Sequence, residues 1–472
     1  RLYVNSGDIS MNRLDDGFNY TITTYNNINE KELQFYRSVG GHNDYIFSTC
    51  DISKDGLHAI IGGAQYNDGR GRIIFLTNNN GTWTAVQHVN SPTADWLRKF
   101  GWSVSISQDG TYAAATQRCG YGDESYIYIY KKSGSTWSQI DSIGPENNNY
   151  FRAVKIRERN DGNVCLFYIR SARLKVQVCT NGTHFSDESI TGINTNTSFE
   201  DDNPHGIDIN DDCTRLVIKK GSSVRIYNIV SATSSGVSVT LIGTISGNSS
   251  DDPCAISGDG TKVAVSDDNA TVSVDSTNHY GWVKVYEYTG DGVNVNEDST
   301  DWSQYGEQLY GATNSSAQFG RGIALNYDGT IVLSGNNAER YSCMFKYRKI
   351  TQSEWTNSDS LGNDYTITNP LILNPGTSWD ANKSYWYQYG PKLGGKASTA
   401  DYSYTYAAAW GNHYALFTGN DGSYGGSHTH YVKDTYSVWH QNYEPIYEHG
   451  HAQYEVASNI NNSGHAFADV SL

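Results

Sequence analysis

The stretch "ISQDGTYAAA" at residues 106–115 places Asp-Gly between two runs of small or apolar residues. Three close copies begin elsewhere in the chain: "ISKDGLHAII" at 52, "ISGDGTKVAV" at 256 and "LNYDGTIVLS" at 325. Two looser copies are "INDDCTRLVI" at 209 and "INNSGHAFAD" at 460. Because one phrase returns at long intervals, the chain is predicted to be built by copying a single structural unit.

Polarity alternates on both sides of each turn residue. Apolar or small residues stand six and four positions before it and three and five positions after it, as Cys50, Ile52, Ala59 and Ile61 do around Gly56. The other turn residues are Gly110, Cys213, Gly260 and Gly329, and a variant copy around Gly162 has Val154 and Ile156 as its inward pair. A period of two predicts strands, and Asp-Gly predicts a tight turn, because Gly adopts positive φ without steric cost. Each copy is therefore expected to be a β-hairpin.

Two further strands are expected after each hairpin. The third alternates apolar and polar residues, as in "YIYIYKK" at 126 and "WVKVYEY" at 282, and the fourth follows a polar turn, as in "NGTWTAV" at 80 and "SGSTWSQI" at 133. Four strands that recur about every fifty residues are typical of a β-propeller blade, which buries its faces only against neighbouring blades. The predicted fold is therefore all-β, a β-propeller of seven or eight four-stranded blades.

The repeats resemble the FG-GAP-like and WD-like propeller repeats of secreted proteins from marine bacteria, protists and large algal viruses. The resemblance is carried by "FGWSVSISQDGTYAAA" at 100, "FGRGIALNYDGTIVLSG" at 319 and the Trp-x-Gln phrases at 137 and 302, and it spans nearly the whole chain. It implies a secreted propeller. The calcium loop of integrin-type repeats, Asp-x-Asn/Asp-x-Asp-Gly, is absent from these turns; the nearest approach is Asp208, Asn210 and Asp212, with a polar strand leading into a turn as the alternative.

Residues 1–472 are predicted to form one propeller. The spacing between hairpins widens after 329, so residues 349–384 are interpreted as an insertion between the third and fourth strands of one blade. The stretch 455–472 has the pattern of the first two strands of a blade, and the stretches beginning at 17 and 32 have the pattern of its third and fourth. We therefore expect N- and C-terminal strands to pair and close the ring, with pairing between molecules as the alternative.

Charge and hydropathy limit the partners. The chain carries 34 Lys and Arg against 50 Asp and Glu, a formal net charge of -16. No cluster of Lys and Arg offsets this charge locally, so binding to nucleic acid or to an anionic membrane surface is not expected. No apolar run approaches the length that crosses a bilayer, which argues against membrane insertion.

Histidines are concentrated near the C-terminal end. Seven of the thirteen lie between His413 and His465, and they include the pairs His428 with His430 and His449 with His451. A His-x-His pair on a strand directs both rings to one side, as zinc or copper ligation requires. Polar loops are the alternative, because no carboxylate or Cys partner stands at a fixed spacing. No cofactor is therefore expected, and zinc or copper here and calcium at the turn around Asp208 are kept as the alternatives.

The seven cysteines are too few to define a disulfide scaffold. Cys165 and Cys179 lie in two strand-like runs, and folding these runs about Ala172 would place the two cysteines opposite each other. This geometry predicts a cross-strand disulfide, with two small buried apolar side chains as the alternative.

Sequons give weaker support for an extracellular chain, since a sequence rich in Asn, Ser and Thr contains many by chance. They occur at Asn19, Asn80, Asn181, Asn196, Asn248, Asn269, Asn314, Asn382 and Asn461. Those at Asn80, Asn181, Asn196, Asn248, Asn269 and Asn314 are the predicted glycosylation sites. An extracellular, cell-surface or virion-surface location is therefore expected.

Two classes of function remain open. The first is a non-enzymatic extracellular propeller, a subunit of a surface filament or coat or an adhesive module, which associates with itself or with other extracellular proteins. The second is a glycan-binding lectin or glycan-active enzyme with a site on the propeller face. No Gly-x-Ser-x-Gly elbow, His-Glu-x-x-His helix or phosphate-binding Gly loop appears. Because the inner-strand positions are expected to be small and apolar in most copies, no catalytic residue is predicted and the first class is favoured.

Overall fold

Small antiparallel sheets account for nearly all of the regular structure. The computed structural model describes residues 9–13, 20–24, 30–33, 49–64, 69–79, 82–93, 98–118, 124–147, 150–170, 172–193, 206–247, 252–274, 276–290, 301–311, 318–336, 341–352, 355, 359–360, 372–373, 378–388, 405–411, 414–421 and 426–433. The elements within these ranges are the strands β1 to β34. No helix in the same ranges is long and apolar enough to span a bilayer. The all-β prediction is confirmed.

Within the described residues, seven sheets of four or more strands follow one another, and we number them 1 to 7. Sheet 1 contains β4 (Thr49–Ile52), β5 (His58–Gly63), β6 (Arg72–Asn79) and β7 (Thr82–Asn90). Sheet 2 contains β8 (Phe100–Ile106), β9 (Tyr112–Gln117), β10 (Glu124–Ser133) and β11 (Thr136–Asn147). Sheet 3 contains β12 (Phe151–Glu158), β13 (Val164–Arg170), β14 (Arg173–Cys179) and β15 (Ser186–Glu188). Sheet 4 contains β17 (Ile207–Ile209), β18 (Arg215–Lys220), β19 (Ser223–Thr233), β20 (Gly236–Ser246) and β16 (Ile190–Thr191).

The remaining sheets depart more from four strands. Sheet 5 contains β21 (Cys254–Ile256), β22 (Lys262–Val274), β23 (Thr277–Tyr288), β24 (Trp302–Gln304) and β25 (Leu309–Tyr310). Sheet 6 contains β26 (Ile323–Leu325), β27 (Ile331–Asn336), β28 (Tyr341–Lys349), β31 (Ser384–Gln388), β30 (Ile372–Leu373) and β29 (Asp359–Ser360). Sheet 7 contains β32 (Thr405–Gly411), β33 (Tyr414–Asp421), β34 (Gly426–Lys433) and β3 (Glu30–Leu33). A separate hairpin is formed by β1 (Ile9–Arg13) and β2 (Tyr20–Thr24).

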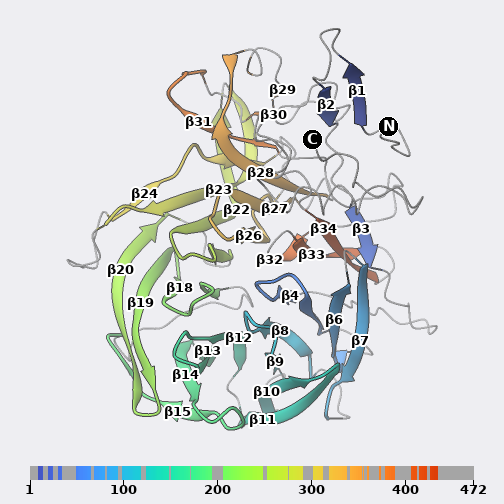
Figure 1. The fold of residues 1–472 in the computed structure, drawn as a ribbon. Helices are drawn as coiled ribbons and strands as arrows, with labels where there is room; N and C mark the ends of the chain where they lie inside the picture. The colour runs from blue at the N-terminus through green and yellow to red at the C-terminus, as the bar shows by residue number, and fades with distance from the viewer. Residues whose placement is uncertain are drawn as a thin grey trace.

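The sheets are arranged around a common centre (Figure 1). First strands such as β4, β8 and β12 lie toward the centre, and last strands such as β7, β11 and β20 lie at the outside. Each sheet contacts the next, and sheet 7 contacts both sheet 6 and sheet 1. Buried apolar side chains gather between consecutive sheets, for example Ile60 and Phe75 of sheet 1 against Val104 and Ile106 of sheet 2. Burial between blades instead of within one blade is what the predicted β-propeller requires.

The number of blades and the closure of the ring stay predictions. Sheet 7 combines β3, from the N-terminal part of the chain, with three strands from 405–433, and β3 pairs antiparallel with β34. The stretch 455–472, for which pairing was predicted, lies outside the described residues. In sheet 6, β28 pairs directly with β31 although residues 350–383 lie between them in the sequence. The insertion 349–384 is predicted at this point of the chain. Both the insertion and the single-domain organisation stay predictions.

The recurring turn is stabilised by its own Ser and Asp. In sheet 2, Ser107 Oγ donates to Asp109 Oδ1 at 2.5 Å and accepts from the Tyr112 amide at 2.9 Å. The same pair recurs in the turns of sheets 1 and 5, as Ser53 with Asp55 and Ser257 with Asp259. Gly110 has a φ of 70°, a left-handed conformation that Gly adopts without a Cβ clash. The repeated sequence phrase therefore supplies the hydrogen bonds and the positive φ that one type of turn requires.

The Phe-Gly phrases fix the contact between sheets. Phe100 is fully buried between sheets 1 and 2, and its backbone forms an isolated parallel bridge with Gly71. A Cβ on Gly71 would meet the carbonyl oxygen and the amide nitrogen of Phe100, so this close approach requires glycine. Gly281 meets Phe319 in the same way between sheets 5 and 6.

Candidate functional site

The inner strands carry polar side chains on the face opposite to the predicted apolar positions. The residue five positions before the turn is Asp51 in sheet 1, Ser105 in sheet 2 and Asp208 in sheet 4. Each accepts a hydrogen bond from a backbone amide of the next sheet: Asp51 from Ile106 (3.1 Å), Ser105 from Ile156 (3.1 Å) and Asp208 from Ile256 (3.0 Å). These amides belong to the innermost strand of a sheet, which has no further strand beside it to accept from them. The side chains therefore join consecutive sheets at the centre.

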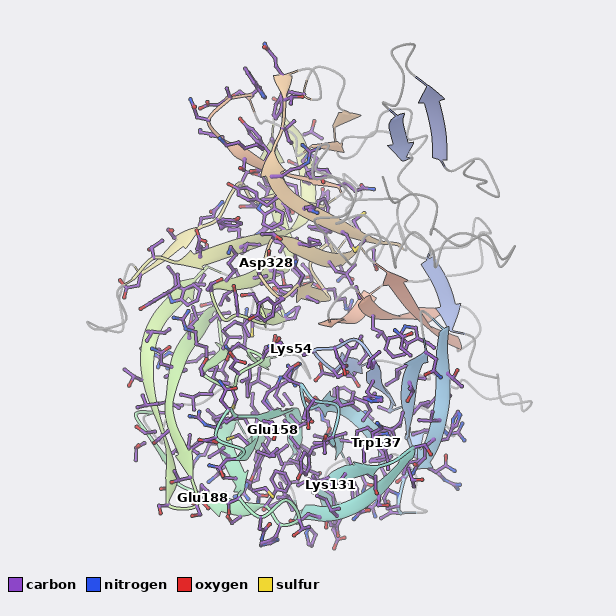
Figure 2. All side chains as sticks on the ribbon, viewed as in Figure 1. Lys54, Lys131, Trp137, Glu158, Glu188 and Asp328 are labelled. Atoms are coloured by element: carbon purple, nitrogen blue, oxygen red, sulfur yellow. The ribbon has the colours of Figure 1, made fainter. Side chains whose placement is uncertain are left out.

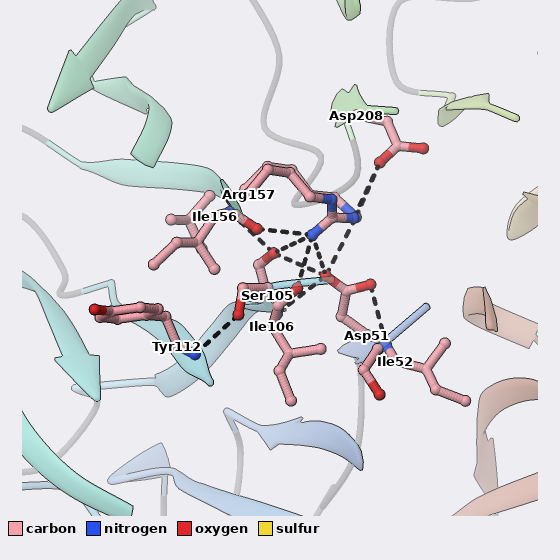
Figure 3. A network of polar contacts seen from close by, with 12 residues as sticks. Asp51, Ile52, Ser105, Ile106, Tyr112, Ile156, Arg157 and Asp208 are labelled. Atoms are coloured by element: carbon pink, nitrogen blue, oxygen red, sulfur yellow. Dashed lines mark hydrogen bonds and ion pairs between the residues drawn. The ribbon is translucent and has the colours of Figure 1, made fainter. Parts of the chain in front are cut away.

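Two cations from sheet 3 complete a buried network (Figure 3). Arg157 Nη1 lies 3.2 Å from Asp51 Oδ2, and it also donates to Ser105 Oγ at 3.1 Å and to a main-chain carbonyl at 2.8 Å. Lys155 Nζ lies 3.1 Å from Asp208 Oδ1 and 3.8 Å from Asp51 Oδ2. The side chains of Asp51 and Arg157 are each only 5% exposed. Two carboxylates and two cations thus balance one another out of contact with most of the solvent.

The electrostatics of the network keep its members charged. Burial alone would raise the pKa of Asp51, but Lys155, Arg157 and the hydrogen bonds from sheet 2 hold this pKa below its ordinary value. Burial alone would lower the pKa of Arg157, and the nearby carboxylates Asp51 and Asp208 reverse that effect. The charges of both groups are therefore used in joining sheets 1, 2, 3 and 4.

At the turn end of the inner strands, Lys54 connects sheets that do not follow one another. Lys54 belongs to the turn of sheet 1, and its Nζ lies 3.7 Å from Asp211 and 3.8 Å from Asp212 in the turn of sheet 4. The same Nζ lies 4.9 Å from the ring centre of Tyr327 in the turn of sheet 6. Figure 2 shows Lys54 near the middle of the ring of sheets. Side chains of the protein itself therefore occupy the centre at this end.

A carboxyl pair lies between the turns of sheets 2 and 3. Burial, together with the charge of Asp109 and a hydrogen bond to it, raises the pKa of Glu158 to about 7. Lys131 opposes this rise, and its Nζ also donates to the Gly182 carbonyl oxygen at 2.9 Å. Glu158 therefore changes charge close to neutral pH, which marks it as a candidate functional group.

The raised pKa of Glu158 predicts a specific pH dependence of stability. Its folded pKa, about 7, is above the ordinary value of 4.5, so the folded state loses stability relative to the unfolded state as the pH rises between these two values. Glu158→Gln removes the titration. We expect the variant to gain melting temperature over the wild type progressively from about pH 4.5 to about pH 7 and to level off above that.

The control for this measurement is Glu188→Gln, on β15 at some distance from the pair (Figure 2). Melting temperatures of the wild type and both variants would be followed in buffers of constant ionic strength. A Glu158→Gln difference that does not change between pH 4.5 and pH 8 would show that the group titrates normally.

A second carboxyl pair, Asp252 and Asp268, is buried between sheets 4 and 5. The two residues are 1% and 8% exposed, and Asp252 Oδ1 accepts from the amide of Asp268 at 3.2 Å. Burial and the charge of Asp268 raise the pKa of Asp252 to about 8, while the buried Lys219 opposes the rise. Because the carboxyls face each other and a buried lysine, this cluster is a contact between sheets.

Two of the four predicted histidine ligands, and all three residues of the predicted calcium turn, lie in the part of the chain that can be described. His428 and His430 lie on β34, where they pair with Gly419 and Phe417 of β33, and His449 and His451 lie outside the described residues. Asp208, Asn210 and Asp212 make separate contacts: with Lys155, with the amides of Thr214 and Arg215, and with Lys54. Within the described ranges, no three His, Cys, Asp or Glu side chains are grouped to hold a metal. Zinc, copper and calcium stay alternatives to the predicted absence of a cofactor.

The register predicted for Cys165 and Cys179 is wrong. In the β13–β14 pair, Cys165 stands opposite Val178 and Cys179 stands opposite Val164. A shift of one residue sends the two thiols to opposite faces of the sheet, Cys165 toward sheet 4 and Cys179 toward sheet 2. Both are free cysteines in the structure.

Two predicted glycosylation sites lie among the described residues. Asn181 is exposed in the turn before β15, where its side-chain oxygen accepts from the amides of Thr183 and His184 at 3.1 and 3.0 Å. Asn269 is exposed, and its Nδ2 donates to Asp268 at 2.6 Å. Asn80, Asn196, Asn248 and Asn314 lie outside the described residues. Glycosylation stays a prediction at all six.

The charged centre was missed by the sequence interpretation. Inner-strand positions were expected to be small and apolar, whereas those of sheets 1, 3 and 4 carry Asp51, Lys155, Arg157 and Asp208. The sequence signal that could have indicated the polar centre is the polar residue between the two apolar positions, in "CDI" at 50, "VSI" at 104 and "IDI" at 207. Alternation sends that residue to the opposite face, toward the next sheet.

Radially arranged sheets joined at the centre by ion pairs define this protein as a β-propeller. No family model and no curated protein matches the chain. Among solved structures it is similar to the β-propeller domain of Cps50 (Swd1) from Myceliophteria thermophila, with a TM-score of 0.48 and 10% identity over 86% of this chain and 98% of that one. It is also similar to hydrazine synthase from Kuenenia stuttgartiensis, with a TM-score of 0.46 and 12% identity over 84% and 98%. A third is the periplasmic gluconolactonase PpgL of Pseudomonas aeruginosa, with a TM-score of 0.41 and 12% identity over 73% and 86%. Such distant likeness concerns the fold and carries no argument about activity.

Proposed function

We propose that this protein is a non-enzymatic extracellular propeller that acts through protein–protein contacts, as a subunit of a surface filament or coat or as an adhesive module. The proposal is carried by the charged centre. Ligand sites in a fold of this kind need polar groups directed at the ligand. Here the central charged side chains bind one another across sheets: Asp51, Lys155, Arg157 and Asp208. Lys54 likewise binds Asp211 in the turn of sheet 4. The central charges thus support a rigid scaffold, which leaves the outer surface for contacts with partners.

The character of the surface favours polar contacts with partners and argues against one large apolar interface. Among the described residues, the large apolar side chains with substantial exposure are scattered over several sheets: Leu57, Val86, Val230 and Tyr327. The net charge of -16 makes copies of the chain repel one another at low ionic strength. Assembly of such a protein on a cell or virion surface therefore depends on screening of this charge.

This dependence gives a direct test. When the ionic strength rises from about 0.01 M to about 1 M, the Debye length falls from about 30 Å to about 3 Å. We expect the weight-average mass from sedimentation velocity to rise with salt, and ordered assemblies to appear by electron microscopy at the higher salt. Sucrose at matched osmolality is the control, because it favours burial without screening charge.

A chain that stays monomeric at every ionic strength and concentration, while it binds a defined glycan on an array, would overturn this proposal in favour of the lectin. One observation favours the lectin: at the turn end of the inner strands, the exposed ring of Tyr327 lies beside Lys54, which also contacts Asp212. Aromatic rings and carboxylates are the groups that bind sugars.

The glycan-active enzyme has less support. Asp109 and Glu158 are hydrogen-bonded to each other. Hydrogen-bonded oxygens lie about 2.5–3.0 Å apart, and glycosidase carboxyl pairs stand about 5 Å or more apart so that the sugar fits between them.

A further inference from the structure

The turn of sheet 4 departs from the repeat at one residue. Glycine occupies the turn position in sheets 1, 2, 5 and 6, with φ between 65° and 75° at Gly56, Gly110, Gly260 and Gly329. Sheet 4 has Cys213 at this position, with a φ of 52°. A side chain in this left-handed region is disfavoured, because its Cβ crowds the backbone. The cysteine therefore carries a conformational cost that the other turns avoid.

The Cys213 side chain lies against a second thiol. Cys213 and Cys165 are both fully buried in the apolar cluster between sheets 3 and 4, and their thiols are hydrogen-bonded to each other. The two sheets are also joined beside them, where Arg159 Nη1 donates to the Cys213 carbonyl oxygen at 3.0 Å. Two thiols from different sheets thus meet at the one turn where cysteine replaces glycine.

We propose that Cys165 and Cys213 form a disulfide that links sheets 3 and 4, made while the chain folds in an oxidising compartment. The oxidant is a small-molecule disulfide such as oxidised glutathione. One cysteine thiolate attacks it and forms a mixed disulfide with release of one glutathione thiol; the other cysteine then displaces the second glutathione. Two protein thiols are oxidised to one disulfide, one small disulfide is reduced to two thiols, and the two protons pass to the departing thiolates.

The timing follows from burial. In the folded protein, the hydrogen bond to Cys213 and the loss of solvent raise the pKa of the Cys165 thiol well above its ordinary value. Both side chains are fully buried, so an oxidant does not reach them once the sheets have packed. The disulfide therefore forms before sheets 3 and 4 close, and a chain that folds under reducing conditions keeps both thiols.

The linkage can be read by peptide mapping. Full-length protein would be refolded with reduced and oxidised glutathione, alkylated in denaturant and digested. Trypsin alone leaves Cys179 and Cys213 in one peptide, because no Lys or Arg lies between them before Arg215. A second protease that cuts at Asp or Glu separates them. We expect one species that joins Cys165 to Cys213 and has two hydrogens fewer than its separate parts, with Cys179 alkylated; recovery of Cys165 alkylated, or linked to Cys179, would overturn the proposal.

A stability measurement with matched variants gives an independent reading. Oxidatively refolded wild type and Cys179→Ala are expected to melt at least about 3 °C above the same proteins refolded with reductant. Cys213→Gly restores the residue of the other turns, so it folds, and it should show no difference between the two conditions. A reductant-sensitive melting temperature that persists in Cys213→Gly would assign the disulfide to other cysteines. The test uses purified protein, so it is independent of the proposed assembly on a surface.

Discussion

Replacing Arg157 with methionine is expected to lower the free energy of unfolding by about 3 kcal/mol, at the lower end of the range for breaking a buried ion pair. The variant leaves the Asp51 carboxylate buried at the centre without its closest cation and removes the donor to Ser105. The loss is limited because Lys155 Nζ remains 3.8 Å from the carboxylate. The measurement is the shift in the denaturant midpoint, followed by fluorescence.

Arg173→Met, at the exposed first position of β14, is the matched control and should change stability by less than about 0.5 kcal/mol.

In the wild type, the depressed pKa of Asp51 stabilises the fold above the pKa of the unfolded chain, and this contribution is lost as the pH falls through the folded pKa. Arg157→Met removes one of the charges that counteract the effect of burial on Asp51, so the pKa of Asp51 in the folded state rises. The difference between wild type and variant should therefore shrink from pH 7 toward pH 4. Equal losses for Arg157→Met and Arg173→Met would show that the central network contributes no stability.

The hairpins were predictable because their information is local. Alternating residues fix which side chains share a face, and Ser, Asp and Gly fix the turn through contacts within five residues of one another, as in Ser107, Asp109 and Tyr112. The third strands were found for the same reason: "YIYIYKK" at 126 lies in β10 and "WVKVYEY" at 282 lies in β23.

The register of β13 and β14 was off by one residue because it depends on the length of the turn. Arg170 pairs with Arg173, so two positions separate the paired residues, and Ala172, the second of them, has a φ of 61°. Folding about Ala172 alone assumes a turn centred on one residue. The two choices differ by one position, and with a side-chain period of two this difference decides which neighbouring sheet each cysteine faces.

The centre was not predictable from one sequence, because its contacts join residues far apart in the chain. Asp51 and Arg157 are 106 positions apart and belong to sheets that do not follow one another. Nothing in the sequence around either residue indicates the other. The alternation places each on the correct face, and only the ring of sheets brings the two charges together.

The contact that brings sheets 1 and 2 together predicts the other large effect. Gly71→Ala is expected to cost about 3–5 kcal/mol, because Gly71 has a φ of 90° and the added Cβ would lie against the carbonyl oxygen of Phe100. Relief requires backbone movement at the Phe-Gly phrase and displaces the buried Phe100 ring. The measurement is the denaturant midpoint together with the melting temperature.

Gly134→Ala separates the two causes of this loss. Gly134 also has positive φ, 60°, but a Cβ there would meet nothing within 4 Å, so the variant should lose only about 1 kcal/mol of conformational strain. Gly281 repeats the geometry of Gly71, with a φ of 81° and its Cβ position against Phe319. Gly281→Ala should therefore cost as much as Gly71→Ala, although it lies between sheets 5 and 6. If all three variants lose the same amount, close packing of glycine against the Phe backbone is not what sets the spacing of the sheets, and the repeated Phe-Gly phrase needs another explanation.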